Sequence, residues 1–167
     1  MPKINVEIGF NGLDALVKQL ETLSDESEDM CKRAIYEGGS IVGNEMKRLI
    51  KGIPTVKDYI QGKADRQIVG ATRDQIDGLI ESMGLAPIQY YGRGLNTKIG
   101  FDGYNDVKTK KYPNGQPNMM IARSINAGTS FRRAYPFVER CGKNAKLPAE
   151  AAMAASLQGA IDSIVNQ

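Results

Sequence analysis

Hydrophobic and polar positions alternate at the start of the chain, where the hydrophobic ones are Ile4, Val6, Ile8 and Phe10. This period of two predicts a strand over 4–10 with one buried and one solvated face. Asn11 and Gly12 then indicate a turn. Apolar residues at helical spacing follow the turn and predict an amphipathic helix over 13–23.

An acidic run at 25–29 comes next in the sequence. Negative side chains in the first turn of a helix interact favourably with its dipole, so the run predicts the start of a second helix. Gly52 and Pro54 predict its end. Glycines inside it each cost about 1 kcal/mol relative to alanine, and close packing against a neighbour or a local kink would explain them; they are Gly38, Gly39 and Gly43.

A third helix and a hairpin are predicted in the middle of the chain. Thr72 and Gln75 have the spacing of a capping box, and Gly84 is expected to end the short helix that follows. Alternating hydrophobic residues then predict strands over 88–91 and 95–101, joined by a Gly-Arg-Gly turn.

Two long segments show neither the helical nor the strand periodicity of hydrophobic residues. Residues 53–71 carry proline, glycine and mixed charge, and residues 102–118 are rich in turn-forming and basic residues. Because long loops often contact partners, we expect both to be exposed arms at an interface between subunits or with a partner. Simple flexibility is an equally good interpretation of 53–71.

The last third of the chain is predicted to be mainly helical. Residues 119–127 predict a short one, Val138, Cys141 and Ala145 indicate another helical start, and Pro148 is expected to open the last helix. The chain is therefore predicted to form a single α+β domain over 1–167, with a small antiparallel sheet (4–10, 88–91 and 95–101) packed against several amphipathic helices and with long exposed loops.

Composition limits the chemistry. The chain has 167 residues and no histidine, which excludes Ser-His-Asp and Cys-His catalysis and histidine-ligated metals. Cys31 and Cys141 are far apart and form no metal or redox motif. The carboxylates Glu7, Glu37, Glu45 and Glu81 occupy polar positions of periodic segments, as solvated side chains do. We expect no enzyme activity, no cofactor and no metal, and, because no apolar span or leader is evident, a soluble cytosolic chain without a membrane partner.

Charge is unevenly distributed, although the net charge is only +3. Successive blocks alternate in sign, from acidic (1–30) to basic (31–73), acidic (74–106), strongly basic (107–147) and acidic (148–167). Such dipolar surfaces suit complementary protein contacts as readily as nucleic acid.

Basic residues stand beside aromatic ones in two places, at Lys108, Lys110, Lys111 and Tyr112 and at Phe131, Arg132, Arg133 and Tyr135. This composition fits a surface that contacts a nucleic-acid backbone and stacks on bases. It equally fits a solvated or protein-facing patch, and the pI near 8.8 and the dense acidic blocks favour that interpretation.

A motif lies at 122–141. Gly128 is expected to end a helix, Thr129 and Ser130 to bond the freed backbone, and Pro136 to open a new helix whose Phe137 fills the core. In this motif, and in its order of elements from about residue 4 to 165, the chain resembles the head–tail joining or tail-completion (neck) proteins of tailed bacteriophages and prophages.

The resemblance implies a structural phage or prophage protein, not an enzyme, that assembles as a ring of six copies at the head–tail neck. It would complete the tail and join it to the head, with neighbouring tail and connector proteins as further partners. Its location would be the virion tail or neck, after assembly in the host bacterial cytoplasm. Gly128, Thr129, Pro136 and Phe137 would then be structural determinants. The alternative function is that of a small nucleic-acid-binding protein.

Overall fold

The computed structural model describes residues 13–56, 68–91 and 94–166 of the chain. The fold is mixed α+β, as predicted, and is dominated by helices, at 61% helical. The elements are α1 (Leu13–Lys51), β1 (Ile68–Val69), α2 (Arg73–Ser82), β2 (Met83–Leu85), β3 (Gln89–Tyr91), β4 (Gly94–Asn96), β5 (Ile99–Phe101), α3 (Asn118–Ala127), β6 (Arg132–Arg133) and α4 (Phe137–Val165). The strand predicted over 4–10 lies outside the described residues.

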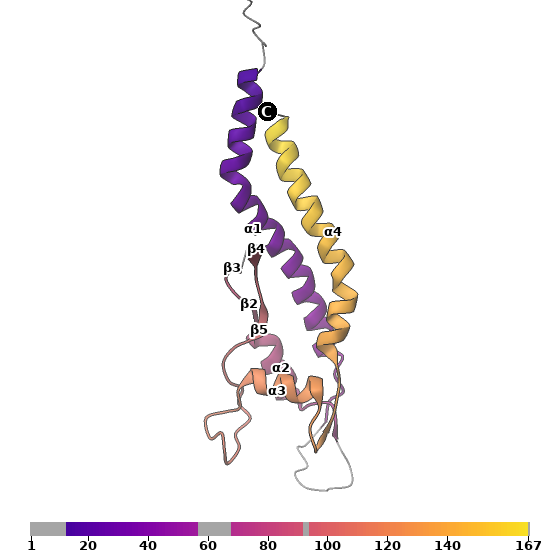
Figure 1. The fold of residues 1–167 in the computed structure, drawn as a ribbon. Coiled ribbons are helices and arrows are strands. Elements are labelled where there is room, and N and C mark those ends of the chain that lie inside the picture. Colours follow the sequence, from indigo (N-terminus) through magenta and orange to yellow (C-terminus); the bar gives the residue numbers. More distant parts are fainter. Residues whose placement is uncertain (1–12, 57–67, 92–93, 167) are drawn as a thin grey trace, which may run out of the picture.

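Two long helices determine the shape of the molecule. Helices α1 and α4 lie side by side and antiparallel (Figure 1), so that α1 begins at the end where α4 finishes. The opposite end, which we call the base, holds α2, α3, β1 and β6 together with the loop over 102–118. The strands β2 to β5 lie along α1 between the base and the middle of that helix.

Helix α1 is continuous where the sequence predicts two helices, so the prediction of a helix start at 25–29 is wrong. The acidic residues lie on exposed turns of α1, and Glu28 forms a 2.6 Å ion pair with Lys32 one turn later. Acidic side chains are compatible with a solvated helix face as well as with a first turn. Because the run contains neither proline nor glycine, nothing in it interrupts the helix. The predicted end is correct, since α1 finishes at Lys51.

Glycines of α1 lie where the helix meets its neighbours. A Cβ atom on Gly38 would come within 2.6 Å of the Met153 side chain of α4, and one on Gly39 would come within 2.9 Å of Leu85 in β2. Both contacts are closer than real Cβ atoms tolerate. Close packing is thus confirmed as the reason for these two glycines.

Helix α4 is also continuous, and the prediction that Pro148 opens a separate helix is wrong. Cys141, Ala145 and Ala149 are buried at intervals of four residues, on both sides of the exposed Pro148. A proline in a helix interior costs about 3 kcal/mol through its missing N–H and its steric clash. Packing of this apolar stripe against α1 holds the helix together across the proline.

Helix α2 begins with the predicted capping box. The Thr72 hydroxyl accepts a hydrogen bond from Gln75 N, and the Gln75 side-chain oxygen accepts one from Thr72 N, both at 3.3 Å. Gly84 does not end the helix as predicted. The backbone turns extended at Met83, and Gly84 lies inside β2.

The strands form three two-stranded sheets: β1 with β6 in parallel, β2 with β5 and β3 with β4 in antiparallel arrangement. The predicted hairpin is confirmed, and it extends back to Met83, which pairs with Phe101. The pairing register changes by one residue between the two ladders, because Gln89 pairs with Asn96 whereas Leu85 pairs with Ile99. This is the arrangement that an extra residue in one strand produces.

The hydrophobic core lies where the base meets the paired helices. Ile50, Leu79, Ile125 and Phe137 are each fully buried there, one from each helix. Phe101 of β5 packs edge-on against Phe137, with ring centroids 6.3 Å apart. The core therefore holds the helices of the base and the adjoining ends of α1 and α4 together.

Candidate interaction surface at the base

Gly128 ends α3 in a conformation that favours glycine, with φ of 78°. A tight turn follows, in which Thr129 N donates to Arg132 O at 2.8 Å and Arg132 N donates to the Thr129 hydroxyl at 3.1 Å. Tyr135 N donates to Ile125 O at 2.8 Å, so a carbonyl freed at the end of α3 is satisfied. Gly128 ends the helix as predicted, whereas the Thr129 hydroxyl bonds the backbone of the turn and not the end of α3. This turn sets the distance and angle between α3 and α4.

Helix α4 begins directly after Pro136, and its first residue, Phe137, is 0% exposed in the core, as predicted. Asn126 of α3 connects the two helices: its Oδ1 accepts a hydrogen bond from Val138 N at 2.9 Å, and its Nδ2 donates to Glu139 Oε1 at 3.1 Å. The sequence alone does not indicate this role of Asn126. An asparagine just before a helix is a recognised capping residue, but here it caps a helix that starts eleven residues later, which local spacing does not reveal.

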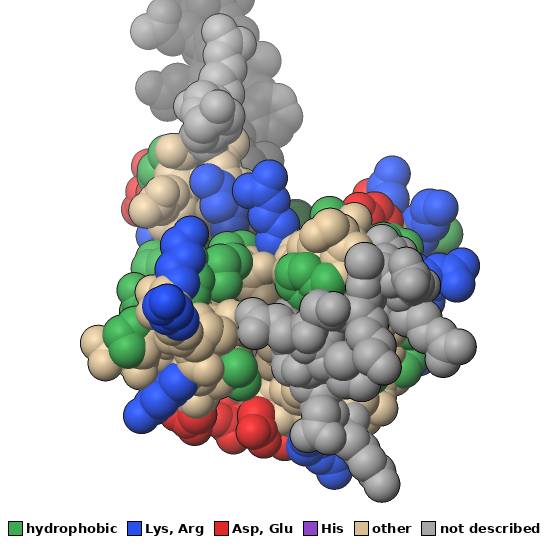
Figure 2. Space-filling view, turned by 90° about the horizontal axis from the view of Figure 1, so that it is seen from below, with side chains coloured by type: hydrophobic (Ala, Val, Ile, Leu, Met, Phe, Trp, Pro, Cys, Tyr) green, Lys and Arg blue, Asp and Glu red, His purple; other side chains and the backbone are tan. Residues whose placement is uncertain are grey.

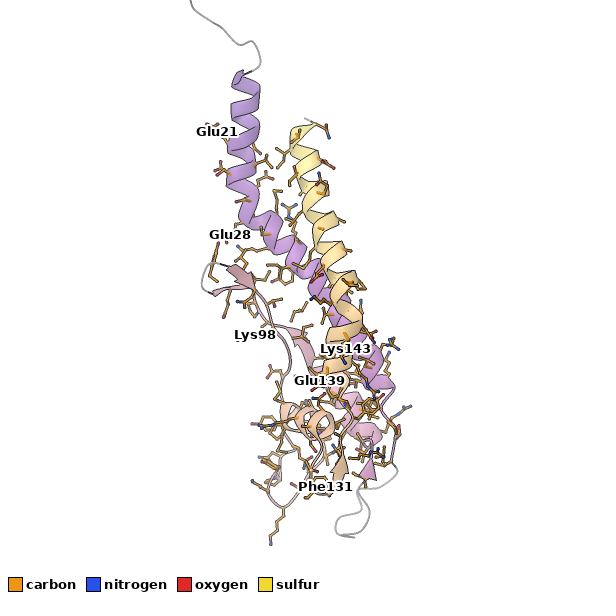
Figure 3. All side chains as sticks on the ribbon, turned by 45° about the vertical axis from the view of Figure 1, so that its right-hand side comes forward. Glu21, Glu28, Lys98, Phe131, Glu139 and Lys143 are labelled. Atoms are coloured by element: carbon orange, nitrogen blue, oxygen red, sulfur yellow. The ribbon has the colours of Figure 1, made fainter. Side chains whose placement is uncertain are left out.

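Arg132 is not part of an exposed basic patch. Its side chain is 1% exposed, and its Nη2 donates a 2.9 Å hydrogen bond to Gln75 Oε1. Arg133 beside it is exposed, and so is Phe131, at 43%. Phe131 lies at the foot of the base (Figure 3). The proposed basic residues therefore divide into a buried structural arginine and an exposed remainder.

The predicted loop over 102–118, which we call the arm, is stiffened by its own backbone. Asn118 N donates to Gly103 O at 3.1 Å, and Asn105 N donates to Gln116 O at 3.0 Å. At the far end Thr109 and Tyr112 exchange two backbone hydrogen bonds of 3.0 Å. The arm is thus a loop, as predicted, and backbone hydrogen bonds close it at its start and at its far end.

The tip of the arm presents cations. Lys110 and Lys111 are the two residues between Thr109 and Tyr112, so they occupy the corner of the turn, and both are exposed, as is Lys108. Lys111 Nζ lies 5.6 Å from the centre of the Tyr112 ring, within the range of a cation–π contact. Within the described ranges of the chain, none of these three lysines forms an ion pair.

An acidic groove lies between α2 and the beginning of the arm, with a volume of about 590 Å³. The residues that line it include five exposed carboxylates and no lysine or arginine: Asp74, Asp77, Glu81, Asp102 and Asp106. Three of them share one face of α2, opposite its buried Ile76 and Leu79. The three- and four-residue spacing of Asp74, Asp77 and Glu81 indicates this acidic face in the sequence. No sequence pattern indicates that Asp102 and Asp106 of the arm complete the groove.

Acidic side chains form a group on the base. Viewed from below, they gather at the lower edge with basic side chains on either side of them, and a further acidic group lies at the upper right among basic ones (Figure 2). A surface divided in this way attracts a complementary surface and repels its own like-charged areas, which favours a defined docking orientation.

Helices α1 and α4 are joined near the base by hydrogen bonds to Glu45. Arg48 of α1 donates two hydrogen bonds to Glu45, of 2.6 and 2.7 Å, and Asn144 of α4 donates a third of 2.7 Å. These bonds, chiefly those from Arg48, lower the pKa of Glu45 to about 2. Nearer the middle of α1, bonds from Lys32 and from Tyr90 of the hairpin lower the pKa of Glu28, which Figure 3 places beside the hairpin.

Most of the side chains considered for catalysis can be placed in the described ranges. Glu45 has too low a pKa for a general base at neutral pH, Glu37 and Glu81 are exposed, and Glu7 lies outside the described residues. Burial raises the pKa of the Cys141 thiol, which disfavours the reactive thiolate. No group of three or more histidine, cysteine or acidic residues in these ranges could hold a metal ion, and none of their helices is long and apolar enough to cross a membrane.

Comparisons of the chain with protein-family models, with curated proteins and with solved structures gave no match.

Proposed function

We propose that the chain is a structural protein of the phage or prophage neck, which assembles into a ring, completes the tail and joins it to the head. The observation that carries the proposal is the division of the base into an acidic groove and a basic arm. A closed ring needs two different, complementary surfaces on each subunit, because each copy contacts its neighbours head to tail.

The joint between α3 and α4 supports the same proposal. The resemblance to neck proteins is carried by the segment 122–141, and its part from Gly128 to Phe137 leads α4 into the core. A joint of this kind is a structural device, since its members are occupied with backbone hydrogen bonds and packing. Its position at the base places it close to the proposed contacts between subunits.

Electron microscopy of the purified protein at low salt tests this function. We expect closed rings, and light scattering should give a mass that decreases toward that of one chain as salt is raised, because salt screens the charged contacts. A protein that stays monomeric at low salt and high concentration would contradict ring assembly. Portal, capsid and tail-tube genes beside this gene would be independent support for the neck.

Nucleic-acid binding is the second candidate, and the exposed cluster of Lys108, Lys110, Lys111 and Tyr112 favours it. A DNA fragment should then be retarded in a gel at low salt, with an affinity that falls steeply as salt rises. Neutralising the three lysines should abolish the retardation. If the wild-type protein leaves the fragment unshifted at low salt, this candidate is wrong.

A further inference from the structure

The floor of the acidic groove contains two polar groups without partners. Asn105 and Asn118 are 5% and 3% exposed, and within the described ranges Asn105 Nδ2 and Asn118 Oδ1 have no hydrogen-bond partner. Their other amide atoms are used: Asn105 Oδ1 accepts from Val107 N, and Asn118 Nδ2 donates to Asp102 O, both at 2.9 Å. One donor and one acceptor therefore remain unused in the floor.

Both residues line the groove beside Gly78 of α2. A Cβ atom on Gly78, which also lines the groove, would lie 3.4 Å from Asn118 Oδ1 and 3.1 Å from Asn105 Cβ. A buried polar group without a partner costs free energy, which a ligand that supplies the missing partner recovers. The unused pair matches a peptide backbone, which offers both an N–H and a carbonyl, and the carboxylates above it match cationic side chains.

The carboxylates are dispersed along the groove and not gathered around one point. Within the described residues they do not form a group that could hold a metal ion. Asp77 also lies 3.8 Å from Arg73 Nε, in an exposed ion pair at the edge of the groove. An extended ligand with several positive charges fits this distribution better than a single ion does.

The arm provides such a segment. Lys108, Lys110 and Lys111 are exposed around a two-residue turn, and none of them lines the groove of their own chain. Backbone hydrogen bonds at both ends hold the arm in shape, so little conformational entropy is lost when it docks. The groove and the arm tip are different surfaces of one subunit, and a contact between them is a heterologous one.

We propose that the tip of the arm, residues 108–112, docks in the acidic groove of the next copy of this chain. The inference rests on the ring proposed above and specifies the contact that closes it. Asp74, Asp77 and Glu81 face the three lysines, and Asn105 and Asn118 bond the backbone of the turn.

Neutralised variants test the contact by mass photometry and electron microscopy at low salt. The groove variant is D74N/D77N/E81Q, and the arm variant is K108Q/K110Q/K111Q. We expect each to lose rings, with association weakened about tenfold or more. Matched controls change exposed charges elsewhere, D25N/E26Q on α1 and K143Q/K146Q on α4, and should keep the rings. Circular dichroism checks that every variant is folded.

An equimolar mixture of the groove and arm variants gives the sharpest result. The first retains a working arm and the second a working groove, so one contact is possible, and we expect a species of twice the chain mass and no ring. If the wild type forms rings and either variant forms them equally well, this inference is wrong while the proposed function stands. A mixture that stays monomeric also overturns the inference. If the wild type itself forms no ring, the proposed function fails first.

Discussion

Arg132 and Gln75 form a buried hydrogen bond of 2.9 Å between residues 57 positions apart. Gln75 Oε1 also accepts the bond from Thr72 N that closes the capping box, so a single oxygen connects the start of α2 with β6. The parallel pair of β1 and β6 lies beside this connection, with Ile68 opposite Arg132. The capping box of α2 is thus bonded directly to Arg132, in the segment that precedes α4.

Replacing Gln75 with leucine should destabilise the base. The change removes an acceptor from a buried guanidinium and one half of the capping box, and we expect the free energy of unfolding to fall by about 2–3 kcal/mol. Denaturant unfolding measures the loss. Glu81→Gln, at an exposed position of the same helix, should change stability by no more than about 0.5 kcal/mol. Equal effects of the two changes would show that the buried bond is unimportant.

Gly128→Ala should destabilise the protein more than Gly103→Ala does. Both glycines have positive φ, of 78° and 64°, so alanine carries a conformational cost of about 1–2 kcal/mol at either position. Only at position 128 would the new Cβ atom also lie 2.8 Å from a backbone nitrogen, that of Ala134, whereas nothing lies within 4 Å at position 103. Thermal unfolding of both variants checks the difference. Similar losses of stability in the two variants would mean that the turn after α3 shifts to relieve the steric clash.

Gly38→Ala should weaken the contact between the long helices. The new Cβ atom would lie 2.6 Å from Cγ and Sδ of Met153, so either that side chain or the helix must move, and we expect a loss of about 1–3 kcal/mol. Gly159→Ala is the matched control. Nothing lies within 4 Å of that position in α4, and alanine should stabilise the helix by about 0.5–1 kcal/mol. A stabilising Gly38→Ala would contradict the close contact.

Glu45 should make stability depend on acid pH. Its pKa is lowered in the folded protein from 4.5 to about 2, so its contribution is complete above pH 4.5 and is lost as the pH falls toward 2. The melting temperature of the wild type should therefore exceed that of Glu45→Gln at pH 7, and the difference should vanish near pH 2. Glu37→Gln, exposed on the same helix, serves as control. A difference that is unchanged at pH 2 would refute the role of the ion pair.

Local signals in the sequence predicted most of the turns and helix ends. The capping box at Thr72, the end of α3 at Gly128 and the start of α4 at Phe137 each depend on a few neighbouring residues, and each is confirmed. The continuity of α1 and α4 was not predictable in this way. Pro148 and the acidic run are local signals for a boundary, and tertiary packing and solvation outweigh them.

The candidate site was predictable only in part. The exposed lysines of the arm follow from composition, but the burial of Arg132 depends on Gln75, which is distant in sequence. Two adjacent residues of a strand point to opposite faces, so Arg132 and Arg133 differ in their surroundings, and the sequence did not specify which of them lies inward. The acidic groove needs α2 and the arm in contact, which a linear pattern does not reveal.

The antiparallel pairing of α1 and α4 also affects how the protein is made. The Cys141 thiol of α4 donates a 3.4 Å hydrogen bond to the Val42 carbonyl of α1, and these residues are 99 positions apart. Helix α4 leaves the ribosome after every other described element, so the face of α1 that packs against α4 has no partner until then. Phe137, Cys141 and Ala145 of α4 belong to the core of the base, so this core is complete only after α4 has been synthesised.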